Sequence, residues 1–477
     1  MSVIRLDGEP FGHQSELTDG ALAGGQPAVP QRDIAMPEEL DYGQMLERFA
    51  HITVGPIIID TSNMARLLKP VEFAAAYAHC CFTSGKAIIP VTELWSRSKH
   101  RMTADRLGFH PSEGKFFTEF GLRHVNLWNP LTWPHADAAL AQPFFQHLAY
   151  LIPEPGARRD LIDWLAHAIQ QPATRPHFHF LLVAPNEGTG RSWVAEVMRA
   201  LLGDHHAGET DLHRLLDDTF NSVLSRKIVV VVHEVKAPSD ERYSHKDRLK
   251  SLLTDAWLTV NEKHLPRWTE RFCCRFLMFT NRDDAIPLSE TDRRIYVVRC
   301  VDNPRSENYY RELYAKLGDR TFLAAVWHAL QSRDIAQFNP GKRAPLNDMK
   351  RQMIAAGRSD EQQTAIDFVQ ACPHPVIAAS DLMHILVPQV DEKERHADRQ
   401  KRVMAVAGAL REVGKQTGPR KVRIGMIVTR VWLLSDTAKW INASAAVLTQ
   451  AATVVHDECV QERFNAEALI ERWTDAL

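Results

Sequence analysis

The apolar positions of this chain change period along its length, and the central part is the most regular. A run over 178–183 and an unbroken run over 228–232 both have the length of strands that are buried on two faces. A third run of this kind extends over 272–280. Between the first two, apolar residues recur over 194–201 with the period of an amphipathic helix. Strands that alternate with helices predict an α/β fold with crossover connections between the strands of a sheet.

The regions on either side follow different patterns. Residues 1–42 mix Gly, Pro, Gln and Asp without periodicity, which is typical of a flexible leader. Short apolar runs alternate with aromatic and Pro-rich stretches over 43–158 and predict a mixed α/β N-terminal domain. A helix expected over 160–171 leads into the central region, whose bounds we place at 159–335. Residues 345–477 predict a mainly helical, winged-helix-like C-terminal domain.

The C-terminal region combines this helical pattern with a local excess of positive charge. Helical stretches within 364–413 precede two strands around a short turn over 421–433. From Arg399 to Arg430 there are nine Lys and Arg residues and one acid, whereas the whole chain has a formal net charge of -2. Such a concentration is typical of a surface that binds a phosphate backbone, although a solvated face that aids solubility is the alternative. The DNA-binding candidates in this region are Arg420, Lys421, Arg423 and Arg430.

Composition excludes several classes of protein. Hydrophobic residues make up 45% of the 477 residues and charged residues 24%, as in an ordinary soluble protein. No window reaches the roughly 18 uninterrupted apolar residues of a membrane span, and no export signal is present at the N-terminus. The seven cysteines contain no C-x-x-C pair. We therefore expect a cytoplasmic protein with reduced core thiols and no membrane partner.

A Gly-rich turn joins the first strand to the amphipathic helix. Residues 185–192 read Pro-Asn-Glu-Gly-Thr-Gly-Arg-Ser. Backbone N–H groups of such a turn and the helix dipole converge on phosphate oxygens, and a hydroxyl at Ser192 reaches Mg²⁺. Pro185 and Arg191 depart from the P-loop pattern, which has Gly first and Lys before the Ser, and a turn without a ligand is the alternative. The candidate nucleotide-binding residues are Glu187, Gly188, Thr189, Gly190, Arg191, Ser192 and Trp193.

Polar residues end the second and third strands. Glu234 follows the run over 228–232, at the position where a P-loop ATPase places the carboxylate that orients water or backs the magnesium ion. An acid is usual at His233 too, and neutral imidazole is a poor ligand for Mg²⁺. Asn281 follows the third run and suits a γ-phosphate or water sensor. The alternatives are a core strand with an acidic end for Glu234 and an ordinary turn former for Asn281.

Two adjacent arginines precede a further strand. Arg293 and Arg294 follow Asp292 and lead into the apolar run 295–298. An arginine at this position of such an ATPase reaches the nucleotide of a neighbouring subunit and stabilises the charge that develops on the transferring phosphoryl group. That role requires a ring of subunits. The alternative is a solvated pair whose local partner is Asp292.

The order and spacing of these features narrow the interpretation. The Gly-rich turn, the acid-ended strand, the Asn-ended strand and the arginine pair fit within about 110 residues. This arrangement resembles the superfamily 3 helicase of AAA+ type, in particular the helicase part of phage and prophage primase-helicase proteins. Lead-in segments over 125–129 and 163–172 are similar to those that precede the P-loop in that family. The resemblance covers roughly residues 45–305.

The resemblance implies an AAA+ P-loop ATPase core with ATP and Mg²⁺ as cofactors. It also implies a homo-oligomer, a hexameric ring, that moves on single-stranded or forked DNA, and it admits a primase on a separate chain. By motif position, it assigns phosphate and metal binding to the turn that ends at Ser192. It assigns catalysis and magnesium binding to Glu234, the sensor role to Asn281, and the finger that acts in trans to Arg293 or Arg294.

The resemblance further points to a DNA-contacting hairpin over 260–268, between the acid-ended and the Asn-ended strands. In these helicases, a hairpin at this place in the chain points into the ring channel. In this chain, the resemblance places Lys263 and His264 at the tip of the hairpin and Arg267 beside them. Cations beside flat side chains suit a sugar-phosphate strand. Trp268 either stacks on a base or packs at the root of the hairpin, and a structural hairpin without DNA contact is the alternative.

We therefore expect an ATP-dependent DNA helicase or translocase of a phage or mobile element. The alternative is a nucleotide-gated DNA-binding or replication-initiator subunit in which Arg191 and His233 have removed most of the turnover. A P-loop phosphotransferase is disfavoured, because the arginine pair, the hairpin and the basic C-terminal region then have no purpose.

Overall fold

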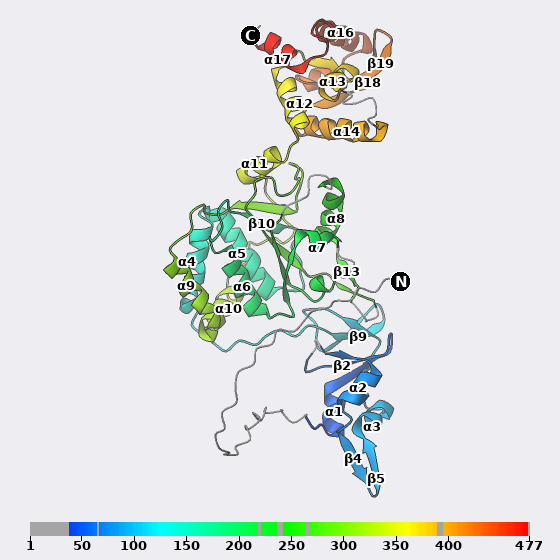
Figure 1. Ribbon diagram of the computed structural model, residues 1–477, viewed down its shortest axis with the longest axis vertical. Helices are drawn as coiled ribbons and strands as arrows, with labels where there is room; N and C mark the ends of the chain where they lie inside the picture. The colour runs from blue at the N-terminus through cyan, green and yellow to red at the C-terminus, as the bar shows by residue number, and fades with distance from the viewer. Residues whose placement is uncertain are drawn as a thin grey trace, which may run out of the picture.

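A computed structural model gives three bodies that follow one another along the long axis (Figure 1). An N-terminal body, drawn in blue and cyan, lies at one end, and a C-terminal body, drawn from yellow to red, lies at the other. A larger central body with a parallel sheet lies between them. The residues that the structure describes are 38–63, 66–217, 221–235, 242–262, 267–388 and 395–475.

The N-terminal body contains three small sheets. Its largest sheet has the order β3-β2-β1-β6, with β1 antiparallel to β2 and parallel to β6. Two further sheets have the orders β4-β5 and β7-β9-β8. The elements are α1 (Tyr42–Arg48), β1 (Phe49–Ile52), β2 (Ile57–Asp60), β3 (Leu67–Leu68), α2 (Pro70–Ala76), β4 (Cys81–Ser84), β5 (Ala87–Pro90), α3 (Val91–Arg97), β6 (Met102–Ala104), β7 (Arg106–Gly108), β8 (Phe116–Glu119) and β9 (Leu122–Asn126).

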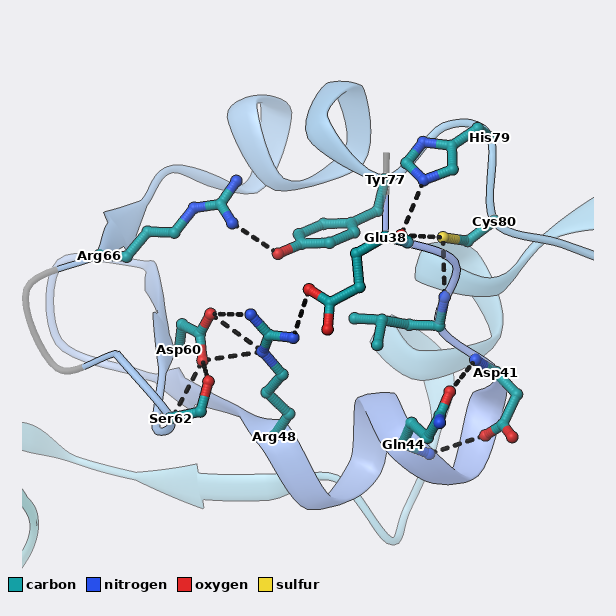
Figure 2. A network of polar contacts seen from close by, with 11 residues as sticks. Glu38, Asp41, Gln44, Arg48, Asp60, Ser62, Arg66, Tyr77, His79 and Cys80 are labelled. Carbon is teal, nitrogen blue, oxygen red and sulfur yellow. Dashed lines mark hydrogen bonds and ion pairs between the residues drawn. The ribbon is translucent and has the colours of Figure 1, made fainter. Parts of the chain in front are cut away.

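A charged network joins α1 to β2 in this body (Figure 2). The Arg48 guanidinium donates to both carboxylate oxygens of Asp60 at 2.8 to 3.0 Å and also contacts Glu38 at 2.7 Å. The Asp60 side chain is fully buried, whereas that of Arg48 is 20% exposed. Burial alone would raise the pKa of Asp60, but the hydrogen bonds from Arg48 and Ser62 lower it overall. The network therefore fixes the end of α1 against β2.

The central body is built on five parallel strands in the order β11-β12-β15-β10-β16. This confirms the predicted α/β fold with a parallel sheet. The three predicted apolar runs correspond to β10, β12 and β15, and β11 is the strand that the pattern did not reveal. The strands are β10 (His179–Val183), β11 (Ala207–Asp211), β12 (Val229–His233), β15 (Arg275–Thr280) and β16 (Ile295–Arg299).

Helices cover both faces of this sheet (Figure 1). The central strand β10 is buried throughout, and its alternate residues belong to two apolar clusters. Phe180 and Leu182 pack with α4 (Gln142–Leu151), α5 (Pro155–Gln170), α6 (Arg191–Leu202) and α10 (Arg320–Gln331). Leu181 and Val183 pack with α7 (Leu212–Asp217), α8 (Arg242–Thr254) and α11 (Asp348–Ala356). The remaining helical elements are η1 (Ala138–Ala141), η2 (Ser222–Leu224), α9 (Glu307–Ala315) and η3 (Lys316–Gly318).

The C-terminal body combines the helices α12 to α17 with a three-stranded antiparallel sheet that has the order β17-β19-β18. Two strands with a short turn are present as predicted, but β18 begins earlier than expected. A register shift near Gly418 and Pro419 hides this start in the sequence, because a bulge with Pro does not resemble a strand. The elements are α12 (Asp360–Ala371), β17 (Val376–Ala378), α13 (Ala379–Leu386), α14 (His396–Glu412), β18 (Gln416–Ile424), β19 (Ile427–Leu433), α15 (Thr437–Trp440), α16 (Ala445–Gln461) and α17 (Ala466–Asp475).

Two expectations from composition have structural counterparts. Within the described residues, no helix has both the length and the apolar character that crossing a membrane requires. The cysteines are all free, and five of them are buried, but Cys81 is exposed and Cys372 is partly exposed. The expectation that all of the thiols belong to the core is therefore wrong for Cys81.

Candidate functional site

The Gly-rich turn connects the carboxyl end of β10 to the first residue of α6. Gly188 and Gly190 have φ values of 75° and 89°, in the left-handed region that favours glycine. A Cβ atom at Gly190 would lie 2.5 Å from Cε1 of His147. Because His147 is buried and held on both ring nitrogens, it has no room to give way. Glycine is therefore required at position 190.

The turn presents polar groups that no described residue satisfies. The Thr189 side chain is 1% exposed, and its hydroxyl oxygen has no hydrogen-bond partner. Ser192, in the first turn of α6, is exposed and makes no side-chain hydrogen bond with a described residue. Gly190 caps α6 without a side-chain bond, so the first N–H groups of the helix are available to an anion. Glu187, next to Gly188 in the turn, is exposed.

The two other predicted binding residues in this segment point away from the turn. The Arg191 guanidinium donates to the carbonyl oxygens of Leu182, at 3.2 Å, and Thr280. It therefore bridges the ends of β10 and β15, and its burial lowers its pKa. The Trp193 indole is fully buried and donates to the Leu313 carbonyl oxygen at 2.8 Å, and the Trp193 backbone N–H donates to the Gly190 carbonyl oxygen at 3.2 Å.

A histidine that the sequence did not reveal supports the turn from α4. With the proton on Nε2, the His147 ring donates to the Gly190 carbonyl oxygen at 3.1 Å and accepts from the Tyr309 hydroxyl at 2.9 Å. Burial lowers the pKa of His147 to about 4, so the ring is neutral at pH 7. The contact joins residues far apart in sequence, and no local pattern indicates it.

Residues after β16 also border the turn. The Asn186 side-chain amide donates to the Asp302 carbonyl oxygen at 2.8 Å. The Arg305 guanidinium lies 4.4 Å from the ring centroid of Tyr150 and 4.7 Å from that of Tyr309. Aromatic faces and guanidinium planes are groups on which a nucleobase stacks. No local sequence pattern indicates this cluster, because its members come from α4, from the segment before α9 and from α9 itself.

Glu234 and Asn281 lie at the same edge of the sheet as the turn. Thr280 pairs with Val183 at the end of β10, and the Ala184 N–H donates to the Thr280 carbonyl oxygen at 3.1 Å. The Thr280 hydroxyl donates to the Val235 carbonyl oxygen at 3.0 Å and so joins the ends of β15 and β12. Glu234, just before this contact, has φ 48° and an exposed side chain, and Asn281 is exposed as well. Three strand ends and the turn therefore meet at the carboxyl edge.

The histidine next to Glu234 has a carboxylate partner from the neighbouring strand. His233 Nε2 lies 3.2 Å from Glu209 Oε2 on β11. Both side chains are partly exposed, and Arg199 of α6 lies 3.5 Å from the other Glu209 oxygen. A carboxylate is thus present beside the position where the usual pattern has an acid. Sequence analysis missed Glu209, because β11 is polar and was not recognised as a strand.

The arginine pair lies at the opposite edge of the sheet. Arg293 and Arg294 precede β16, and β16 is parallel to β10, so both residues lie at the amino edge. Arg293 is exposed, whereas Arg294 is half-buried and lies 3.9 Å from Asp292. The Asp292 carboxylate accepts from the N–H of Arg294 and contacts the buried Lys350 ammonium at 3.2 Å. The pair therefore lies away from the Gly-rich turn of its own subunit.

A cationic cavity of about 460 Å³ opens at this amino edge. Arg175 is part of its lining and donates to the carbonyl oxygens of Leu252 and Asp255, and burial lowers the pKa of Arg175 to about 10. The one acidic side chain in the lining is that of Asp255. Such an excess of positive charge suits a phosphate-rich ligand. The cations in the lining are Arg175, Arg271, Arg293, Arg294, Lys342 and Arg343.

The predicted hairpin is formed by β13 (Trp257–Val260) and β14 (Trp268–Arg271). Lys263 and His264, expected at its tip, lie outside the described residues. Arg267 is exposed and its Nε donates to the Asn261 side-chain oxygen at 3.2 Å. Trp268 is 8% exposed and donates to the Glu270 carboxylate at 2.9 Å. Of the two alternatives for Trp268, the structure therefore has packing at the root of the hairpin.

The basic residues of the C-terminal body fall into two groups. Cations of α14 are partly neutralised, as in the ion pair between Arg402 and Glu361 and that between Lys401 and Asp398. The four predicted DNA-binding residues of the hairpin are exposed and form no ion pair with any residue in the described ranges. These four are Arg420, Lys421, Arg423 and Arg430.

Comparisons with known proteins place these features in context. Residues 182–294, from β10 to the arginine pair, match the model of a family of unknown function, DUF5906. The chain is similar to the DNA primase-polymerase of Nitratiruptor phage NrS-1, with 27% identity over 209 residues. The match covers 42% of this chain and 28% of the phage protein, so the chain spans little more than a quarter of that relative's length.

Solved structures define the fold similarity. The C-terminal region of NrS-1, in its apo form, aligns with a TM-score of 0.55 over 83% of this chain and 100% of that chain, at 15% identity. A second structure of the same region gives a TM-score of 0.54 over 82% of this chain and 99% of that chain, also at 15% identity. At this level of identity, the similarity is one of fold.

Proposed function

We propose that this chain is an ATP-dependent replicative DNA helicase or translocase of a phage or mobile element, with an AAA+ P-loop ATPase core. The observation that carries the proposal is the position of the Gly-rich turn. The turn follows β10, from which the chain continues to β11 on one side of the sheet and later returns to β16 on the other side. Ligands of parallel sheets bind at the carboxyl ends of strands at such a switch point.

ATP and Mg²⁺ fit the groups at this edge. The left-handed glycines, the free N–H groups of α6 and the unsatisfied Thr189 hydroxyl suit phosphate oxygens. Ser192 and Glu234 are the candidate residues at the metal ion, and Glu187 is exposed in the turn. Bound ATP supplies the phosphoryl group whose transfer to water releases free energy. Glu234 orients that water and Asn281 senses the γ-phosphate.

The arginine pair suggests how subunits assemble. Because Arg293 lies at the amino edge and the turn lies at the carboxyl edge, one subunit can complete the site of the next in a head-to-tail contact. A closed series of such contacts is a ring, for which we propose six subunits. In this arrangement Arg293 or Arg294 stabilises the charge on the transferring phosphoryl group, and the cationic cavity faces the neighbour's nucleotide.

DNA binding is assigned to two surfaces. The hairpin with Lys263, His264 and Arg267 contacts single-stranded DNA, and the winged-helix-like C-terminal body contacts the duplex part of a fork. The similarity to a phage DNA primase-polymerase supports a place in phage replication. A primase on a separate chain is a suitable partner for such a motor.

One observation favours a second candidate, a nucleotide-gated DNA-binding or initiator subunit with weak or no turnover. Arg191, at the position where P-loops have Lys, contacts the carbonyl oxygens of two strands instead of facing the turn. The charge that usually stabilises the β- and γ-phosphates is then withdrawn from them. In this candidate, nucleotide binding changes the conformation and the DNA affinity without a cycle of hydrolysis.

Phosphate release with and without single-stranded DNA separates the two candidates. The motor is expected to hydrolyse ATP faster with DNA, and Glu234→Gln is expected to bind ATP but to lose turnover by roughly a hundredfold or more. If the wild-type chain binds ATP and releases no phosphate under either condition, the motor proposal fails and the initiator stands. Negative-stain images with an ATP analogue and an oligonucleotide test the ring, for which a six-fold particle is expected.

A further inference from the structure

The hairpin of β18 and β19 ends in an apolar tip that other described residues leave largely uncovered. Met426 is 90% exposed, Ile427 is 55% exposed and Val428 is 61% exposed. Gly425, with φ 56°, lies in the turn that places these three residues at the end of the hairpin. Three consecutive large apolar residues at one tip are typical of a surface that another molecule covers.

The strands behind the tip carry cations on their solvent face. Lys421 pairs directly with Arg430 across the two strands, and Arg423 pairs with Val428. Like charges that face each other across a ladder repel and destabilise the hairpin. No acidic residue in the described ranges forms an ion pair with Lys421, Arg423 or Arg430. The repulsion is relieved when a polyanion binds to this face.

The other face of the hairpin is fixed to the body. Val422 and Ile424 are 2% and 4% exposed and pack with Leu448 and Ala452 of α16. The base of the hairpin therefore has one orientation, and the tip extends beyond the residues that α16 covers. An apolar tip on a fixed base can enter a groove without ordering a flexible loop, which lowers the entropic cost of binding.

We propose that Met426, with its two neighbours, inserts as a wedge into the minor groove of duplex DNA while Lys421, Arg423 and Arg430 hold the phosphates at the rim. Apolar side chains that enter the minor groove partly unstack a base step and kink the duplex. The spacing fits the groove, which is about 7.5 Å deep. Counted from the Ile424–Ile427 pair next to the turn, Arg423 lies one residue pair behind and the Lys421–Arg430 pair lies three behind, at roughly 3 and 10 Å along the strands. The proposal rests on the duplex binding proposed above, but not on ATP turnover.

The test uses the full-length chain and a duplex with 2-aminopurine at successive steps, whose fluorescence rises when the base unstacks. Wild-type protein is expected to raise the fluorescence at one step. The double variant Met426→Ser, Ile427→Ser is expected to lose that signal and to bind duplex roughly tenfold more weakly, because an apolar contact is lost. The salt dependence of binding is expected to stay unchanged, because no cation is removed. The matched control is Val71→Ser, which replaces an exposed apolar residue of the N-terminal body and is expected to behave like the wild type.

Two further arms separate this proposal from the proposed function. Lys421→Ala with Arg430→Ala is expected to reduce the slope of log K against log salt by about 2. If this variant loses duplex affinity while the tip variant keeps both the fluorescence signal and the affinity, duplex binding stands and the wedge is refuted. ATP hydrolysis without DNA is expected to be the same in the tip variant and the wild type, so a loss of ATPase activity bears on the core alone.

A basic hairpin with an apolar tip also has the chemistry of a membrane-binding loop. Flotation of the wild-type chain with phosphatidylserine vesicles tests that occupant. The wedge would be overturned in favour of a lipid surface by two results together: the wild type floats and the tip variant does not, and the tip variant still binds duplex as the wild type does. The expected result is no flotation and weakened duplex binding.

Discussion

His147 Nε2 lies 3.1 Å from the carbonyl oxygen of Gly190, the N-cap of α6, and so joins α4 to the Gly-rich turn. The other ring nitrogen is 2.9 Å from the Tyr309 hydroxyl, which belongs to α9. The turn is therefore held by a neutral, buried ring whose two nitrogens have opposite hydrogen-bonding roles. Because the ring occupies the space where a Cβ atom at position 190 would stand, the turn and the ring depend on each other.

Gly190→Ala tests this dependence. The substitution places a Cβ atom against the His147 ring and forces Ala into a left-handed conformation, so we expect nucleotide affinity to fall by at least tenfold. Fluorescence titration with a labelled ATP analogue measures the affinity. Gly85→Ala is the matched control, because Gly85 has φ 62° with nothing within 4 Å of its added Cβ atom. Equal affinities in the two variants would contradict the role of the contact.

Arg191→Ala separates a structural role from a phosphate-binding role. The substitution removes a charged donor from the carbonyl oxygens of Leu182 and Thr280, and we expect the free energy of unfolding to fall by about 2 kcal/mol. Nucleotide affinity is expected to change by less than about tenfold, because the guanidinium faces away from the turn. Urea unfolding and nucleotide titration measure the two effects. Arg199→Ala, on the exposed side of the same helix, is the control and is expected to cost less than about 1 kcal/mol. Unchanged stability with lost nucleotide binding would mean that Arg191 contacts phosphate.

Mixing two inactive variants tests the head-to-tail contact. Glu234→Gln lacks the carboxylate that we propose as catalytic but keeps its arginines, whereas Arg293→Ala with Arg294→Ala keeps Glu234. In a mixed ring, some interfaces combine the intact Glu234 of one subunit with intact arginines of the next, so ATPase activity is expected to reappear. Phosphate release from mixtures of varied ratio measures it. Arg97→Ala is the control on an exposed arginine outside the core. No recovery at any ratio would exclude an arginine that acts in trans.

Asp60→Asn tests the buried ion pair of the N-terminal body. The change leaves Arg48 without its bidentate acceptor, and we expect a loss of about 3 kcal/mol in the free energy of unfolding. Glu93→Gln breaks the exposed pair with Arg97 and is expected to cost at most about 1 kcal/mol. Denaturant titration of both variants against the wild type gives the comparison. If Asp60→Asn loses less free energy of unfolding than Glu93→Gln, the buried ion pair does not stabilise the protein more than the exposed one, and the prediction is wrong.

Stability is expected to fall between pH 6.5 and pH 4. His147, His167 and His206 are at most 1% exposed, and burial lowers their pKa values to about 4, about 3 and about 4. The unfolded chain binds protons below about pH 6.5 and the folded chain does not, so acid favours unfolding. Each histidine contributes a loss of roughly 2 kcal/mol at pH 5 relative to pH 7. Urea titrations at both pH values measure it, and His147→Gln is expected to reduce the difference by one histidine's share. Equal stability at the two pH values would refute the expectation.

Much of the sheet could be predicted from the sequence, because continuous apolar runs have few alternatives in a chain of this size. The runs over 178–183, 228–232 and 272–280 correspond to β10, β12 and β15. β11 was not predicted because it is an edge strand with the polar sequence Ala-Gly-Glu-Thr-Asp. Its extended conformation depends on hydrogen bonds to the neighbouring strand β12 and not on its own residues. Propensity alone does not identify such a strand.

The polar residues at the carboxyl edge could be predicted in position, but not in orientation. That Glu234 and Asn281 lie beside the turn follows from parallel strands ending at one edge. The orientation of the Arg191 guanidinium is set by the carbonyl oxygens of Leu182 and Thr280, which are distant from each other in sequence. The His147 contact has the same origin. Such contacts are set by the packing of helices on the sheet and leave no local pattern.

The Gly418–Pro419 bulge in β18 has a consequence for solubility. β18 is an outer strand of its sheet, and an outer strand with unpaired N–H and C=O groups invites another chain to add to it. Pro419 lacks an N–H, the register shift bends the strand, and Arg420 with Lys421 adds charge along the same stretch. Two copies of the hairpin therefore cannot join strand to strand into a continuous sheet, although each presents bare apolar side chains at its end.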